Sequence, residues 1–387
     1  MNLPLAIAVR GYAVSVHAAA EPSQDRPKTP KRKGLRKPSK ETLVFDCETT
    51  TDYAQSLRFG TYQCRKEGKL VEQGIFYEPD NPQTLSSKDI AVIRNYATKR
   101  GLNCHTRDEF IQDIFYRYAY AYGAAVVGFN LPFDISRLAI KFGTAHARDM
   151  RGGFTFKLSN TPHHPNVVIK HLNSRASFIR FAASGQRDSR SERKKDIRKE
   201  HRTGYFQDVK TLAAALLGKS HSLKSLADTL ETEHRKLDAG GHNRAVTARY
   251  LDYAMADTQV TWECYEKLLV MYEAHGLTDM PAHRIYSEAS LGKAYLSHMG
   301  IQPLRKVQPG IPPELIGQIM GAYYGGRAEV RIRRQITRVL YCDFRSMYPT
   351  VCTLMGLWRF VIAKGFEWAD WAAEARSLLE RAELGDL

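Results

Sequence analysis

Short apolar runs separated by polar turns fill most of the chain, and their periods predict alternating strands and helices. The run TLVFD, residues 42–46, and the run AAVVGFN, residues 124–130, are apolar almost throughout and predict buried strands. Two further strand-like runs surround Tyr62 and Ile75. The alternating segments VVIKHL and SFIRF, within residues 154–182, predict antiparallel strands.

Helical spacing of apolar side chains predicts the remaining elements. It is present over residues 107–122, and FDISRLAIKFG, residues 133–143, predicts a helix directly after the strand AAVVGFN. Helices are expected to dominate residues 209–275. Further along, a strand is expected at 336–344 and an amphipathic helix near 367–384. This alternation is typical of an α/β protein.

Positive charge is concentrated in two segments of the chain. The formal net charge is +16, to which residues 1–40 contribute nine basic against two acidic residues, and residues 187–202 eight against four. We expect residues 1–40 to be a disordered basic tail and residues 184–203 to be an exposed helical insertion. Each segment either contacts nucleic-acid phosphates or is simply solvated, and the sequence leaves both interpretations open.

The remaining composition narrows the class of protein. The hydrophobic content of 43% is ordinary for a globular chain, and no apolar run reaches the roughly 20 residues that cross a bilayer. No membrane partner is therefore expected. The six cysteines form no CxxC pair and no zinc spacing, which predicts reduced thiols and a cytoplasmic location.

Three motifs contain the candidate chemistry. In FDCET, Asp46 and Glu48 occupy alternate positions of a strand, so both carboxylates point to one face. Asp134 follows the next buried strand in GFNLPFD, where a helix N-cap is the alternative interpretation. In YAMADTQVTWECY, Tyr253 and Asp257 lie four residues apart on one face of a helix. Converging carboxylates are what two divalent cations require for phosphodiester hydrolysis.

The order D-x-E, N-x-x-F-D, Y-x-x-x-D resembles the three exonuclease motifs of family B DNA polymerases. The exonucleases of these polymerases belong to the ribonuclease-H-like DEDD group, tyrosine subtype. The resemblance implies an exonuclease domain over residues 41–275, in which a mixed sheet is flanked by helices. It also implies two Mg²⁺ or Mn²⁺ ions per active site and a water-orienting tyrosine, Tyr253. The implied metal ligands are Asp46, Glu48, Asp134 and Asp257.

The same resemblance implies contacts to the DNA strand. Thr49, Asn130 and Phe133 correspond to residues that contact the 3′ end of a single strand. A basic residue that assists the scissile phosphate is expected as well, and Arg235 and Lys236 are both candidates. Asp208, in the run FQDVKTL, is expected to be structural rather than a metal ligand.

Two later motifs resemble the start of a polymerase palm. Tyr323 to Gly326 match the family signature Y-x-G-G within a linker at 276–335, and YCDFRSMYP, residues 341–349, resembles the first catalytic palm motif. Family motifs for the second palm carboxylate (Y-x-D-T-D) and the fingers helix (K-x-x-x-N-S-x-Y-G) are absent from the sequence. Residues 336–387 are therefore expected to be an incomplete, truncated palm, without polymerase activity in this chain alone. The implied site residues are Tyr323, Gly325 and Gly326 for DNA, Asp343 for catalysis and metal, and Ser346, Met347 and Tyr348 for the nucleotide.

These features predict the N-terminal portion of a family B DNA polymerase of phage, plasmid or mobile-element type, with a 3′–5′ proofreading exonuclease. The expected partners are single-stranded DNA and primer-template DNA, with dNTP only if the palm is completed. A terminal protein or a second polypeptide with the rest of the polymerase is a further candidate. Two alternatives stay open: a ribonuclease-D-like RNA exonuclease, and an inactive DNA-binding remnant of a truncated polymerase gene.

Overall fold

A computed structural model of the 387-residue chain describes most of the sequence. The described residues are 37–79, 81, 83–182, 203–236, 245–321, 330–340, 342, 347–365 and 367–382. The chain divides into two compact units, one of residues 33–295 and another whose described part is 296–382. Each unit is treated by itself below.

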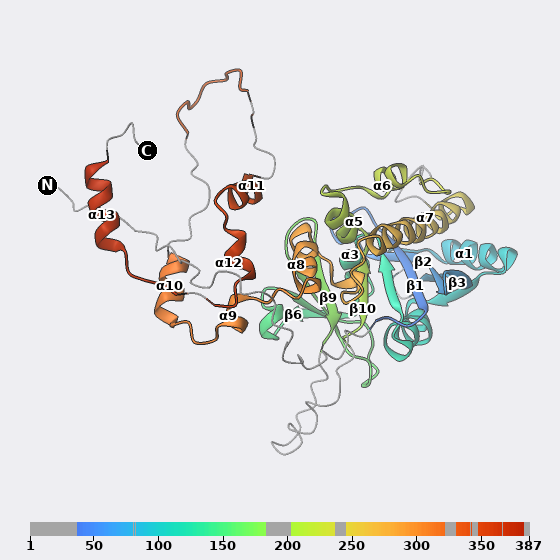
Figure 1. The fold of residues 1–387 in the computed structure, drawn as a ribbon. Coiled ribbons are helices and arrows are strands. Elements are labelled where there is room, and N and C mark those ends of the chain that lie inside the picture. Colours follow the sequence, from blue (N-terminus) through green and yellow to red (C-terminus); the bar gives the residue numbers. More distant parts are fainter. Residues whose placement is uncertain are drawn as a thin grey trace, which may run out of the picture. The chain divides into compact units, whose positions relative to one another are not determined.

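A six-stranded mixed sheet organises the unit of residues 33–295 (Figure 1). The strand order is β10-β5-β1-β2-β3-β4, in which β1–β2 and β2–β3 are antiparallel and the other pairs are parallel. The strands are β1 (Glu41–Thr49), β2 (Leu57–Lys66), β3 (Lys69–Tyr77), β4 (Asn103–Thr106), β5 (Ala125–Gly128) and β10 (Tyr205–Asp208). The predicted α/β class, a mixed sheet flanked by helices, is confirmed.

Helices cover both faces of this sheet because successive strand residues point to opposite sides. On one face, Val44 of β1 packs in a cluster with residues of α5, α6 and α7, which Figure 1 shows above the strands. On the other face, Leu43 and Phe45 pack against the helical segment that contains Phe110 and Phe115. The helices of this unit are α1 (Ser87–Arg100), α2 (Arg107–Glu109), α3 (Leu131–Arg137), α5 (Val209–Leu217), α6 (Leu223–Leu230), α7 (Ala248–Glu273) and α8 (Glu288–His298), with π-helical turns at Phe110–Phe115 and Arg117–Tyr122 and 3₁₀ turns at Arg148–Met150 and Ala282–Arg284.

Side-chain caps fix where several of these helices begin. Ser86 and Asp89 form a reciprocal capping box at α1, and Ser222 and Ser225 form one at α6. Thr247 accepts a hydrogen bond from the backbone N–H of Tyr250 at the start of α7. The start of the longest described helix, which carries one of the acidic motifs, is thus set by local sequence.

A second sheet of four antiparallel strands lies in the same unit, in the order β6-β7-β8-β9. Its strands are β6 (Lys141–Thr144), β7 (Phe154–Lys157), β8 (Val167–His171) and β9 (Ser177–Phe181). The strands predicted within 154–182 are confirmed. The helix predicted over 133–143 is wrong in its second half, because α3 ends at Arg137 and β6 pairs with β7. Sheet pairing satisfies the backbone there better than an isolated extension of a short helix.

The described residues 296–382 form short helices without buried side chains. These helices are α9 (Leu304–Val307), α10 (Pro313–Gly321), α11 (Met347–Leu354), α12 (Trp358–Ile362) and α13 (Ala372–Arg381). The last of these matches the helix predicted near 367–384. The strand predicted at 336–344 is wrong where it can be checked, since residues 336–340 and 342 belong to no strand or helix. Most of the predicted tail (1–40) and nearly all of the predicted insertion (184–203) lie outside the described residues. Within the described ranges, no helix is both long enough and apolar enough to cross a bilayer.

Candidate metal centre

Three carboxylates from two elements meet on the sheet face that α7 covers. Asp46 and Glu48 follow Val44 at alternate positions of β1, and Asp257 lies on α7. One carboxylate oxygen from each residue lies within 4.8 Å of the other two. Glu48 and Asp257 are buried, Asp46 is half-buried, and a cleft of about 400 Å³ opens beside them. The structure therefore brings together three of the four carboxylates that the sequence nominated.

The electrostatics of this cluster disfavour three free negative charges. Burial first, and then the charges of Glu48 and Asp257, raise the pKa of Asp46 well above its ordinary value. Burial also raises the pKa of Glu48 to about 7, against a hydrogen bond from Tyr250 that lowers it. Carboxylates crowded in this way gain from a neighbouring positive charge.

Lys236 supplies one positive charge from the segment that follows α6. Its Nζ lies 2.5 Å from Asp257 Oδ2 and 5.1 Å from the centre of the Tyr253 ring, and it lines the cleft. The neighbouring Arg235 instead pairs with Asp228 on α6, where both side chains are exposed. The structure thus places Lys236, and not Arg235, beside the carboxylates, a choice that the sequence left open.

Two tyrosines of α7 frame the cluster. Tyr253 lines the cleft one helical turn before Asp257 and hydrogen-bonds it. Burial, followed by the charges of Asp257 and Glu48, raises the pKa of the Tyr253 phenol, so the hydroxyl keeps its proton at neutral pH. Tyr250, which the sequence analysis did not nominate, donates a hydrogen bond of 2.7 Å to Glu48 Oε2.

Asp134 lies next to this group without being a member of it. Its Oδ1 accepts a 3.3 Å hydrogen bond from the backbone N–H of Cys47, on β1 between the two acidic positions. Its Oδ2 is buried and has no hydrogen-bond partner among the described residues. Burial and the charge of Asp46 raise the Asp134 pKa well above its ordinary value. Asn130, not Asp134, occupies the N-cap position of α3, so the alternative interpretation of Asp134 as an N-cap is wrong.

Asp208 explains how α3 is held in place. Its Oδ1 accepts hydrogen bonds from the backbone N–H groups of Asn130 and Leu131, at 2.8 and 3.1 Å. Its Oδ2 accepts from the Thr211 hydroxyl at 2.6 Å and caps α5. The carboxylate is fully used in joining the start of α3 to the start of α5, which is the structural role expected for it.

The other nominated residues fall into two groups. Thr49, Asn130 and Phe133 are half-buried in the unit of residues 33–295, where the Phe133 ring lies 4.8 Å from the Arg137 guanidinium. None of the three lines the cleft. In the other unit, Met347 and Tyr348 are exposed at the start of α11. Five nominated residues lie outside the described ranges: Tyr323, Gly325, Gly326, Asp343 and Ser346.

Four further residues line the cleft, and the sequence analysis nominated none of them. Phe129 comes from the turn after β5, and Ser222, Leu223 and Lys224 come from the start of α6. A signal for the second group existed in the sequence, since Ser222 begins a reciprocal cap and a capped helix end is a common place for polar ligands to bind. Nothing in the local sequence indicated that this helix end would face Asp46.

Comparisons with known proteins give likenesses to solved structures only. No family model matches the chain, and no curated protein does. A solved structure, "Phi29 DNA polymerase complexed with single-stranded DNA", is similar with a TM-score of 0.39 and 16% sequence identity. The likeness covers 76% of this chain and 41% of that chain, so this chain spans less than half the length of that polymerase chain. Function depends on the residues of the cleft rather than on the fold.

Proposed function

We propose that this protein is a 3′–5′ exonuclease that hydrolyses single-stranded DNA with two divalent cations. The observation that carries the proposal is the cluster of Asp46, Glu48 and Asp257, with one oxygen of each within 4.8 Å of the others, beside Tyr253 and Lys236. A cation, a phenol and three carboxylates on one cleft wall are the groups that phosphodiester hydrolysis needs.

The residues fit hard divalent cations. All the donors are carboxylate oxygens, which Mg²⁺ and Mn²⁺ prefer over nitrogen or sulfur. The buried Oδ2 of Asp134, close to Asp46 but without a described partner, is a further oxygen for the same purpose. We infer that Asp46, Glu48, Asp257 and Asp134 hold two ions. Bound there, the ions would lower the pKa of the attacking water and offset charge on the phosphate.

The chain's own residues then have separate tasks. The Tyr253 hydroxyl keeps its proton and directs the water that Asp257 faces. Lys236 meets the phosphate that approaches the carboxylates and balances its charge. Thr49, Asn130 and Phe133 contact the terminal nucleotides, with Phe133 stacking on a base.

The wider proposal concerns the protein to which this module belongs. The motifs at 323–326 and 341–349 support the N-terminal portion of a family B DNA polymerase, with Asp343, Ser346, Met347 and Tyr348 as its first palm residues. A stand-alone RNA nuclease has no use for these motifs. The motif of the second palm carboxylate is absent from these 387 residues, so we propose no dNTP incorporation by them alone.

Digestion of labelled oligonucleotides tests the exonuclease. With Mg²⁺ or Mn²⁺, a 5′-labelled single-stranded DNA should give a ladder that shortens from its 3′ end, and EDTA should abolish it. A matched RNA oligonucleotide should be degraded far more slowly. Preferential degradation of RNA would favour the ribonuclease-D-like alternative. No degradation of either substrate by folded protein would favour the inactive remnant.

A further inference from the structure

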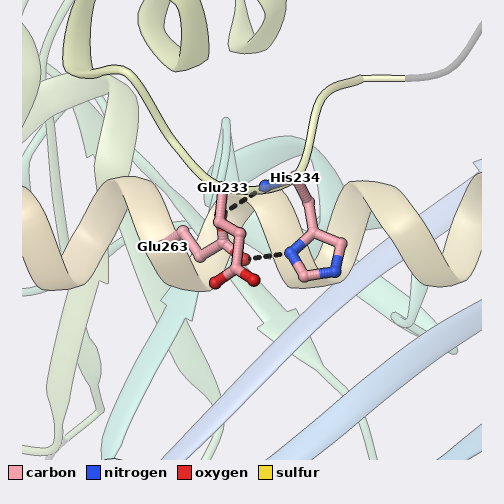
Figure 2. A group of neighbouring side chains, drawn as sticks. All are labelled: Glu233, His234 and Glu263. Carbon is pink, nitrogen blue, oxygen red and sulfur yellow. Dashed lines mark hydrogen bonds and ion pairs between the residues drawn. The ribbon is translucent and has the colours of Figure 1, made fainter.

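His234, in the segment between α6 and α7, makes two contacts to one residue of α7, Glu263. The backbone N–H of His234 donates to Glu263 Oε2 at 3.0 Å, and its ring Nδ1 lies 2.5 Å from Glu263 Oε1. Figure 2 shows Glu263 projecting from the helix toward the loop that carries His234 and Glu233. Because an ionised carboxylate only accepts hydrogen bonds, Nδ1 carries the ring hydrogen in this contact.

Glu263 is itself held in place by a partly buried network of hydrogen bonds. Gln259, one turn earlier on α7, donates to Glu263 Oε1 at 2.8 Å. The Gln259 oxygen accepts in turn from Gln63 and Arg65 of β2, at 3.0 and 2.8 Å. The position of the Glu263 carboxylate is therefore fixed by both the helix and the sheet, and a fixed acceptor orders whatever binds to it.

Glu233, His234 and Glu263 also have the composition of a cation site, and their ligand atoms lie within 4.8 Å of one another. The hydrogen bonds favour a different role. Glu263 Oε1 already accepts from His234 and Gln259, and Oε2 accepts from the His234 backbone. A carboxylate whose two oxygens both accept hydrogen bonds from the protein holds the chain in place, and binding a cation would compete with those hydrogen bonds.

The contact between His234 and Glu263 lies close to the metal centre along the chain. Lys236, the cation beside Asp257, comes two residues after His234, and Asp257 lies six residues before Glu263 on α7. Six helical residues span about 9 Å. Two extended residues cover roughly 7 Å and a lysine side chain covers the rest of that distance. Lys236 therefore reaches Asp257 when His234 is held at Glu263.

We propose that the His234–Glu263 contact, here called the loop clamp, is a positioning device that aims Lys236 at the carboxylate cluster. In this role Glu263 and His234 act through Lys236 and not on the substrate directly. The inference rests on the proposed function for its catalytic consequence, but the placement of Lys236 can be measured without any nuclease activity.

Chemical labelling of lysines tests the placement. The full chain is treated briefly with acetic anhydride, and mass spectrometry compares the labelling of Lys236 with that of Lys88, an exposed lysine on α1. Glu263→Ala should raise the ratio about threefold, as expected when a modest ion pair is released. Glu233→Ala is the matched control, because it removes the neighbouring carboxylate and leaves the clamp intact. An unchanged ratio in folded Glu263→Ala, or an equal rise in both variants, would overturn the proposal.

Kinetics tests the catalytic consequence. In the wild-type background, Glu263→Ala should lower kcat about fivefold with little change in KM, since it loosens one charged contact. In a Lys236→Ala background the same substitution should have no further effect. An equal loss in both backgrounds would show that Glu263 acts through general stability, which contradicts the clamp. If the wild-type chain shows no nuclease activity, the proposed function fails and the labelling alone decides the clamp.

Discussion

The two units of this chain differ in how far their motifs are supported by packing. In residues 33–295 the acidic motifs lie on elements that are anchored in hydrophobic clusters on both faces of a sheet. In the described part of 296–382 no side chain is buried, and large apolar residues such as Ile336, Leu340 and Leu354 are exposed. The acidic motifs of β1 and α7 therefore converge on a cleft, whereas Met347 and Tyr348, which the sequence nominated for a palm, are exposed at the start of α11.

This difference shows what a motif needs before it can act. Carboxylates that are held a few ångströms apart by packed elements can bind metal. The free energy of packing offsets the repulsion between their like charges, so the ligands are already in position. A motif without a surrounding core has no such preorganisation. We therefore expect activity from the first unit and none that depends on the second.

The largest expected effect comes from removing a clustered carboxylate. Asp46→Ala or Asp257→Ala should lower the rate of DNA shortening by at least about 100-fold, because electrostatic stabilisation is concentrated in the cluster. Asp113→Ala, at an exposed position of the π-helical segment, is the control and should keep full activity. Full activity in both cluster variants would remove the basis for contrasting the two units.

The next largest effect is expected from removing the positive charge of Lys236, and Arg235 beside it serves as the control. Lys236→Ala should slow DNA shortening about 10- to 100-fold, because the variant loses a charge that faces the phosphate. Arg235→Ala removes an equal charge that pairs with Asp228 outside the cleft, and its rate should be nearly unchanged. Rates measured at saturating oligonucleotide decide the matter, and equal losses in the two variants would contradict the assignment of Lys236.

Removing the hydrogen bond from Tyr250 to Glu48 should have a smaller effect. Tyr250→Phe deletes a donor to a charged acceptor, a change worth about 1.5–3 kcal/mol in comparable contacts. We expect the Mn²⁺ concentration for half-maximal activity to rise, because Glu48 is no longer held in one orientation. A titration with unchanged midpoint would show that Tyr250 contributes packing only.

The pKa of Glu48 predicts how stability depends on pH without metal. Burial raises this pKa to about 7 in the folded chain, above its ordinary value of 4.5, so folding favours the protonated carboxyl. Its stabilising effect is complete below pH 4.5 and is lost as the pH rises through about 7. In EDTA the melting temperature should therefore fall across this window, and Glu48→Gln should flatten the fall. The same slope in the variant would contradict the prediction.

The smallest effect is expected from removing the second unit. Ending the chain after Gly300 keeps α8 complete and keeps every residue that lines the cleft. The shortened protein should digest DNA within about twofold of the full chain, as a domain with its own core does. A large loss of activity would show that residues 301–387 complete the nuclease, and the contrast between the units would then be wrong.

The sequence predicted the parts of the site that short spacing determines. Asp46 and Glu48 share a face because a strand has a period of two, and Tyr253 and Asp257 because a helix has nearly four residues per turn. The choice between Arg235 and Lys236 depends on a loop, in which Lys236 pairs with Asp257, 21 residues further along the chain. Tyr250 and the start of α6 likewise reach the site through tertiary packing.

The dependence on tertiary contacts also explains the two errors in the predicted elements. The apolar run in residues 133–143 suits a helix locally, but β6 forms because β7 offers backbone partners. The strand expected at 336–344 has no neighbouring strand in the described part of the chain, and a strand without a partner has no hydrogen-bonded ladder to stabilise it.

The most direct test of the metal centre is a crystal of the full chain grown with Mn²⁺ and measured for anomalous scattering. We predict two peaks about 4 Å apart, bordered by Asp46, Glu48 and Asp257, with the free oxygen of Asp134 turned toward one of them. No peak at these residues, or a peak only at Glu233, His234 and Glu263, would contradict a two-metal nuclease in this cleft.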